Sequence, residues 1–191
     1  MKHKILLFLT ALGLAFGLSA CSFGDFMSYL YGSENAAKDA PAYVQYDGAN
    51  GVSVIYDTSV WEAPTEPQPD TVSLMCGTSF NYTAVLLQVT DTYTDFLAQS
   101  GAELAEETTA AVEEPMDFTV PDAAVKAVGY DCGGYQAVFA EVTYDSGLTV
   151  YVSAMTHSAE TDHIVSLLQG VFPTGQTPES AAALLTEDAA A

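Results

Sequence analysis

Residues 135–155 read YQAVFAEVTYDSGLTVYVSAM. On both sides of the central Asp145-Ser146-Gly147, apolar residues occupy alternate positions. Successive side chains of a β-strand point to opposite faces, so this pattern predicts two strands that each bury one face. The three central residues predict a hairpin loop in which Gly147 adopts the left-handed conformation. We therefore expect an antiparallel sheet at the centre of the fold.

One strand is predicted before this hairpin and one helix after it. The strand covers residues 125–130, and the helix covers residues 158–172. Ser158 can cap that helix, and the acids at positions 160 and 162 suit the positive end of its dipole. The buried stripe is predicted to consist of Ile164, Leu167, Leu168 and Val171.

The N-terminal half supplies further strands. They are predicted at 43–46, 52–56, 71–75 and 82–89. The first two form a hairpin, while the last is almost continuously apolar and is expected to be central and covered on both faces. Residues 62–70 contain Pro64, Pro67 and Pro69 and are predicted to form a loop.

The spacing of apolar residues changes from two to three or four within residues 91–107, which predicts a helix there. Tyr93, Phe96, Leu97 and Leu104 fall on one helical face. The acidic segment at 108–121 is expected to be irregular, with a short edge strand near residues 116–120.

The order of elements predicts an α+β fold, an antiparallel β-sheet with helices packed on its faces. The layout resembles the PsbP-like sandwich. That resemblance rests on Gly51–Tyr56 followed by Trp61, and on Tyr135–Met155 running into the helix at 158–172. It implies a mostly non-enzymatic domain that contacts partners or small ligands, and it assigns no catalytic residue.

The N-terminus has the features of a secretory signal. Lys2 and Lys4 precede a short apolar segment, which ends in Leu18-Ser19-Ala20-Cys21. This tetrapeptide resembles the bacterial lipobox. The resemblance implies that Cys21 carries a diacylglycerol thioether and becomes the mature N-terminus. An ordinary secretory signal with a coincidental cysteine is the alternative.

These observations divide the chain into four parts. Residues 1–20 are a lipoprotein signal peptide, and residues 21–42 are a flexible tether. Residues 43–173 form the α+β domain, and residues 174–191 are an acidic, alanine-rich tail with Thr177 and Pro178 at the start of a frayed helix. The expected location is extracytoplasmic, with the N-terminal lipid anchoring the protein to a bacterial membrane.

The charge balance disfavours several classes of function. The chain has 4 Lys+Arg against 25 Asp+Glu, a formal net charge of −21. Nucleic-acid binding and phosphoryl transfer both depend on clustered basic side chains, so neither is expected. The negative field instead favours a cationic protein or peptide, with a small ligand as the other expected kind of partner.

Two cysteines and two histidines of the predicted domain are candidates for chemistry. Cys76 and Cys132 are a candidate disulfide outside the cytoplasm, with two buried thiols as the alternative. A Cys–His or zinc site that also uses His157 and His163 has no recognised spacing. His163 is expected at the surface, and His157 is expected to bond locally.

No catalytic, cofactor-binding or metal-binding residue is assigned, and no cofactor is expected. The leading hypothesis is a non-enzymatic binding module of the cell envelope. The alternative is an envelope hydrolase with an unrecognised carboxylate or Cys–His site.

Overall fold

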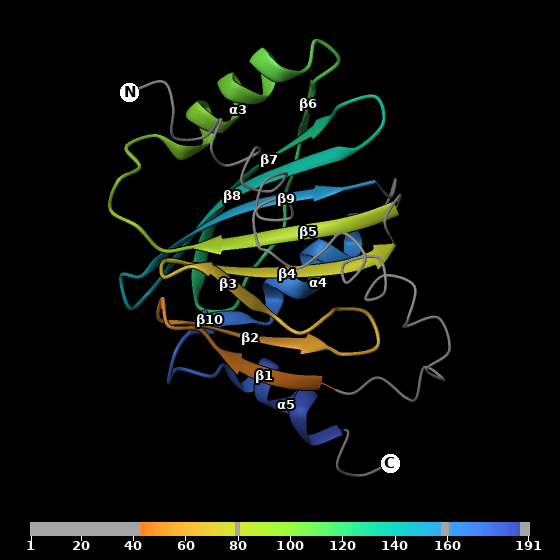
Figure 1. Ribbon diagram of the computed structural model, residues 1–191. Helices are drawn as coiled ribbons and strands as arrows, with labels where there is room; N and C mark the ends of the chain where they lie inside the picture. The colour runs from red at the N-terminus through yellow and green to blue at the C-terminus, as the bar shows by residue number, and fades with distance from the viewer. Residues whose placement is uncertain (1–42, 79–80, 158–160, 188–191) are drawn as a thin grey trace.

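The computed structural model describes residues 43–78, 81–157 and 161–187 (Figure 1). Within these ranges the fold is α+β, with two antiparallel sheets and three helices. The expected fold class is confirmed at this level. The predicted single sheet is wrong, because the first hairpin and one short later strand form a second sheet of their own.

The larger sheet has seven strands in the order β3-β4-β5-β9-β8-β7-β6. Its strands are β3 (Thr65–Gln68), β4 (Thr71–Thr78), β5 (Asn81–Gln88), β6 (Val112–Pro115), β7 (Ala123–Asp131), β8 (Gln136–Tyr144) and β9 (Thr149–Thr156). The hairpin of β8 and β9 is confirmed, with Val142 opposite Val150 and Gly147 at a φ of 88°. Strand β5 is buried from Thr83 to Gln88, as its apolar composition predicts.

The smaller sheet contains β1 (Tyr43–Asp47), β2 (Val52–Asp57) and β10 (Val171–Pro173), in the order β1-β2-β10. Strand β10 occupies the end of the helix predicted at 158–172. The helix α4 (Asp162–Gln169) is shorter than expected and ends at Gly170. Residues after Gly170 are extended because they pair with β2, with Phe172 opposite Ser53.

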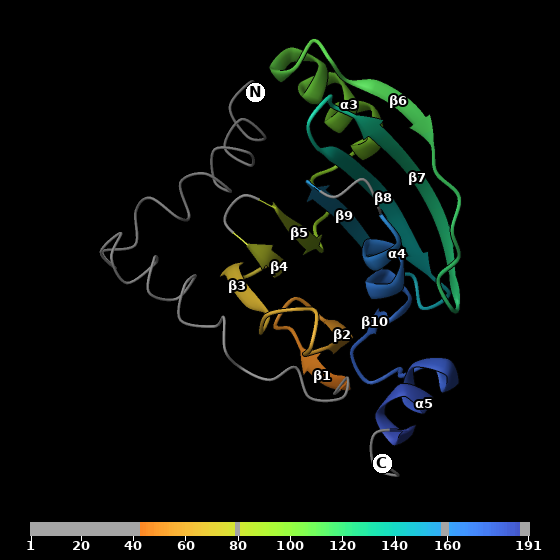
Figure 2. The same cartoon turned by 90° about the vertical axis from the view of Figure 1, so that its right-hand side faces the viewer.

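Two helices cover opposite faces of the seven-stranded sheet (Figure 2). Helix α3 (Phe96–Glu107) packs over β8 and β9, where Phe96 meets Phe139 of β8 and Tyr151 of β9. Helix α4 lies on the other face, and its buried Ile164, Leu167 and Leu168 join the main core.

The main core fills the space between the two sheets. Inward residues of β8 and β9 alternate with half-exposed ones, as their sequence predicts. Phe172 is fully buried, and the single tryptophan, Trp61, is buried in the same core. Burial of large apolar side chains supplies most of the stability of such a core.

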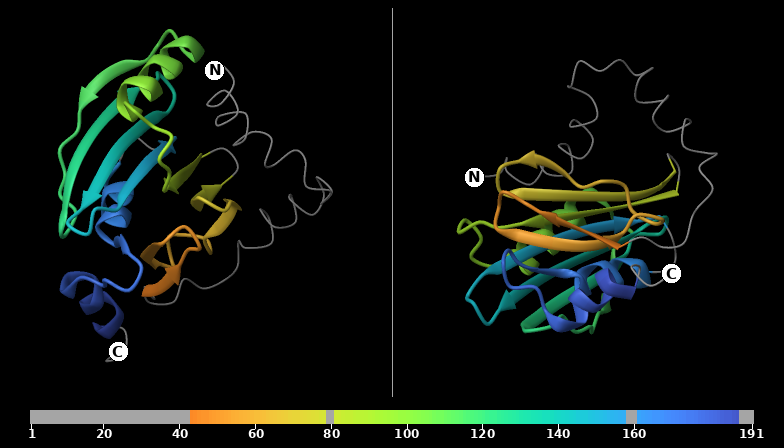
Figure 3. Two further views of the ribbon diagram at one scale, coloured as in Figure 1. Left: turned by 90° about the vertical axis from the view of Figure 1, so that its left-hand side faces the viewer. Right: turned by 90° about the horizontal axis from the view of Figure 1, so that it is seen from below.

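The C-terminal segment is part of the folded body. Helix α5 (Glu179–Glu187) contacts β1 and β2, and Ala181 is 1% exposed (Figure 3). The frayed or disordered tail expected at 174–191 therefore contains a packed helix, at least as far as residue 187.

Both edges of the larger sheet differ from the expectation. Strand β3 lies inside the loop predicted at 62–70, and β6 lies at Val112–Pro115 and not near 116–120. Both strands are exposed throughout, and each contains a proline, Pro67 in β3 and Pro115 in β6. Such short polar strands carry little hydrophobic signal, which is why the apolar pattern does not reveal them.

Candidate functional site

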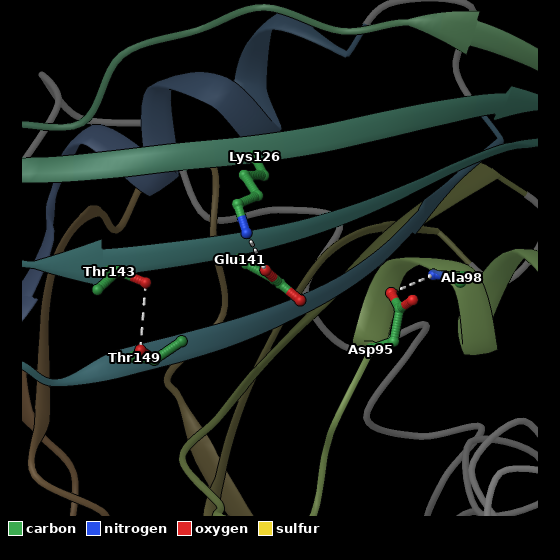
Figure 4. Close-up of polar contacts among 6 residues, drawn as sticks. All are labelled: Asp95, Ala98, Lys126, Glu141, Thr143 and Thr149. Carbon is green, nitrogen blue, oxygen red and sulfur yellow. Dashed lines mark hydrogen bonds and ion pairs between the residues drawn. The ribbon is translucent and has the colours of Figure 1, made fainter.

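The described surface is almost devoid of basic side chains. Lys126 is the single Lys or Arg of the described residues, and its Nζ lies 3.3 Å from Oε2 of Glu141 (Figure 4). The pair links β7 to β8 on the face of the sheet that carries α3, beside the Thr143–Thr149 hydroxyl contact of 3.2 Å. An exposed ion pair of this kind neutralises one acid, so the remaining carboxylates set the field around the domain.

A hollow of about 410 Å³ opens between α5 and the segment that leads into β7. Its lining residues are Thr119, Val120, Pro121, Gln169, Ser180, Ala181 and Leu184. None of these side chains is ionisable, although the chain as a whole is strongly acidic. The volume lies in the range of roughly 300–1,000 Å³ that is typical of ligand pockets.

A smaller hollow of about 70 Å³ shares Pro121 with the larger one. Its lining includes two carboxylate residues, Asp122 and Asp145, and two further prolines, Pro173 and Pro178. We call the two hollows together the α5 groove. The groove is apolar at one end and acidic at the other.

The backbone brings the two aspartates together. Asp122 has a φ of 55°, a left-handed conformation that aspartate tolerates better than most residues. Its carbonyl oxygen accepts a hydrogen bond of 3.1 Å from the amide of Asp145, which follows β8. The turn into β7 and the β8–β9 loop are thereby fixed side by side.

The wall behind the aspartates is also fixed. The hydroxyl of Tyr144 donates a buried hydrogen bond of 2.7 Å to the carbonyl oxygen of Val171. Burial raises the pKa of this phenol, so it remains a donor across the physiological pH range. This bond joins the end of β8 to β10 and holds the floor of the smaller hollow.

His163 is not the surface residue that its position suggests. Its Nε2 lies 2.6 Å from Oγ1 of Thr83, which in turn lies 2.7 Å from Oγ1 of Thr156. The imidazole also packs against Trp61, with the two ring centroids 5.9 Å apart. An imidazole–hydroxyl contact resembles an activated nucleophile, but Thr83 is 4% exposed and a nucleophile must reach its substrate. The contact therefore ties α4 to β5 and β9.

His157 lies on the opposite face of the sheet, and the expected local bond is wrong, because its partner Tyr82 is distant in sequence and lies on β5. Its Nδ1 is 3.4 Å from the carbonyl oxygen of Tyr82, and its ring packs against the rings of Tyr82 and Tyr135. Alternation along the strands separates this aromatic group from the His163 contact. The two histidines do not converge on one site.

The candidate disulfide between Cys76 and Cys132 is absent, and of the two thiols that the alternative places in the core, Cys132 is buried and Cys76 is half-buried. Cys76 lies in β4, and Cys132 follows β7, four strands away in the sheet. Four strand spacings amount to about 19 Å, whereas bridged Cα atoms lie within about 7 Å. Sequence spacing contains no information on this separation.

The Cys132 thiol is expected to react slowly in the folded protein. Burial raises its pKa, so the nucleophilic thiolate is scarce at neutral pH. Iodoacetamide labelling of residue 132, followed by mass spectrometry without reductant, should be slow in buffer and fast in urea. The labelling rate in buffer should continue to rise with pH beyond the point at which an ordinary thiol reaches its plateau. A failure to label in urea would contradict the structure, because it would indicate a blocked or bridged sulfur.

No group of three or more His, Cys, Asp or Glu that could hold a metal ion occurs among the described residues. Cys21, the predicted lipidation site, lies outside them. None of the helices within the described ranges has the length and apolarity required to cross a membrane.

Comparison with known proteins adds no relative. The chain matches no protein-family model, and no curated protein matches it significantly.

The α5 groove is the feature that sequence reasoning missed. The sequence pattern predicts Asp145 only as a turn residue and places residues 119–121 in an irregular acidic segment. Pro178 at a helix start was the one available signal, but nothing in the sequence shows that this helix packs beside residues 119–122.

Proposed function

We propose that the protein is an extracytoplasmic bacterial lipoprotein, anchored through Cys21, whose α+β domain is a non-enzymatic module that binds a cationic partner. The observation that carries the proposal is the charge of the domain. A single lysine stands among its carboxylates, and that lysine is already paired with Glu141. A surface of one sign attracts oppositely charged proteins and raises their association rates.

The lipobox supports the anchoring part of the proposal. Leu18-Ser19-Ala20-Cys21 follows an apolar segment at the distance typical of lipoprotein signals, and residues 22–42 separate it from β1. Anionic head groups repel a strongly acidic domain, so acyl chains are required to hold it at a membrane.

We further propose that the domain has the PsbP-like fold that its sequence resembles, and the arrangement of helices supports this. Helix α3 covers one face of the seven-stranded sheet, and α4 covers the other. This layering agrees with a sheet between helices, and the family resemblance suggests contact with partners more than catalysis.

The binding proposal is tested by partner capture followed by kinetics. Crosslinking on intact cells isolates the partner, whose association with the full-length lipoprotein is then measured in phosphatidylcholine vesicles. Between about 0.01 M and 0.15 M salt the Debye length shortens from about 30 Å to 8 Å, and we expect the association rate to fall at least about tenfold.

A variant with fewer charges distinguishes long-range electrostatic steering, which affects the association rate, from direct contact in the complex, which affects the dissociation rate. Glu106, Glu107, Glu113 and Glu114 are exposed, and glutamine at all four positions removes charge without changing side-chain size. The variant should associate more slowly at low salt and dissociate at the wild-type rate. Association that responds to neither salt nor this variant would refute the proposed function.

A further inference from the structure

We propose that the α5 groove is where the cationic partner docks, and that its occupant is a peptide segment with an apolar side chain next to an arginine or lysine. This inference rests on the proposed function and deepens it, because it assigns the recognition to one place. The observation that carries it is a hollow without ionisable lining residues next to one bordered by two aspartates.

The larger hollow selects an apolar group. Val120 and Ala181 are buried at its base, and Pro121 and Leu184 add apolar wall. The hydroxyls of Thr119 and Ser180 and the amide of Gln169 also line it, and such groups can bond a peptide backbone. A hollow of about 410 Å³ is large enough for one or two side chains of a peptide.

The smaller hollow selects a positive charge. Asp122 and Asp145 both line it, and no Lys or Arg does. Pro121 borders both hollows, so an apolar side chain in one places its neighbours in the peptide beside the two carboxylates. A guanidinium or ammonium group bound there would form charge-assisted hydrogen bonds with these two carboxylates. Charge complementarity thus selects a cationic segment over a neutral or acidic one.

The groove is formed before binding. The Asp145–Asp122 backbone bond, the Tyr144–Val171 bond and three prolines hold its acidic end in place. Fixed walls lower the entropy lost when a ligand is ordered. The inferred partner segment therefore needs to be short, since a few anchoring residues account for most of the binding energy in such sites.

The probe is a blocked peptide in which one phenylalanine stands between two arginines. Calorimetry with the full-length protein in detergent measures its Kd, and a second peptide has glycine in place of the phenylalanine. Burial of a phenylalanine side chain contributes roughly 1.5–3 kcal/mol, so the glycine peptide should bind at least about tenfold more weakly.

Matched variants test each end of the groove. Asp122→Asn with Asp145→Asn should weaken binding of the phenylalanine peptide about fivefold, the effect of two exposed ion pairs. Glu113→Gln with Glu114→Gln removes the same charge from β6 and should weaken binding clearly less. At the apolar end, a tryptophan side chain should fill the larger hollow. Either Ser180→Trp or Thr119→Trp, from opposite walls, should therefore abolish the preference for the phenylalanine peptide over the glycine peptide. The control Ala105→Trp on α3 should preserve this preference.

The outcomes distinguish this inference from the function on which it rests. If both peptides bind equally, or the two charge variants weaken binding equally, the groove assignment is overturned while binding to a diffuse acidic surface stands. If the phenylalanine peptide does not bind, the groove assignment is also overturned. The proposed function fails separately, if the captured partner associates at a rate that salt and the glutamine variant leave unchanged.

Discussion

Replacement of Gly170 by alanine is expected to lower the free energy of unfolding by about 3 kcal/mol, from overpacking and a lost hydrogen bond. Gly170 lies between α4 and β10, where a Cβ atom would clash with the carbonyl oxygen of Ile55. The carbonyl oxygen of Gly170 accepts a hydrogen bond of 2.8 Å from the amide of Ile55. Alanine would push this junction away from β2, and the pairing of Phe172 with Ser53 would weaken with it.

Urea unfolding followed by the fluorescence of Trp61 measures this effect. Trp61 is the single tryptophan and is buried in the core, so its signal reports the loss of tertiary packing. Gly134→Ala is the matched control, because no atom lies within 4 Å of the added Cβ and the φ of Gly134 is not left-handed. The control should remain within about 0.5 kcal/mol of wild type. Equal urea midpoints for the two variants would show that the close approach at Gly170 is wrong.

Replacement of Cys21 by alanine is expected to abolish attachment of the proposed lipid anchor. Each buried methylene of an acyl chain contributes about 0.8 kcal/mol, so the proposed diacylglycerol group would account for nearly all of the affinity for the bilayer. The net charge of −21 adds repulsion between the chain and anionic lipid head groups. The variant should leave the membrane pellet, or accumulate with its signal peptide intact.

Metabolic labelling with an alkyne fatty acid, combined with cell fractionation, measures this result. Cys132→Ala is the control, because it removes a different cysteine and should retain both the label and the membrane location. A Cys21→Ala protein that still takes up the fatty acid would eliminate the lipobox assignment.

Local sequence patterns were sufficient to predict most elements of the described domain. The β8–β9 hairpin and the β1–β2 hairpin have short turns, and their alternating residues need only neighbours along the chain. Helix α3 was predicted within 91–107, and the structure adds its start, where the Asp95 side chain accepts a hydrogen bond of 3.3 Å from the amide of Ala98 (Figure 4).

The errors occur where partners distant in sequence decide the conformation. Residues 171 and 172 continue the predicted helical pattern, yet they belong to the strand β10 because β2 offers an unpaired edge to them. The separation of Cys76 from Cys132 depends on the order of five strands, which no local pattern specifies. The α5 groove likewise depends on the packing of α5 beside residues 119–122. Tertiary contacts override local preference at each of these places.

The prolines in the two edge strands of the larger sheet disfavour pairing between neighbouring copies of the protein. The proposed lipid anchor would confine the molecules to two dimensions, where like-oriented domains collide side by side and exposed sheet edges could pair into ribbons. Pro67 in β3 and Pro115 in β6 lack the N–H group that an incoming strand would need, and Glu113 and Glu114 add repulsion between copies. Such a protein can cover a membrane densely while each copy remains a separate monomer along these edges.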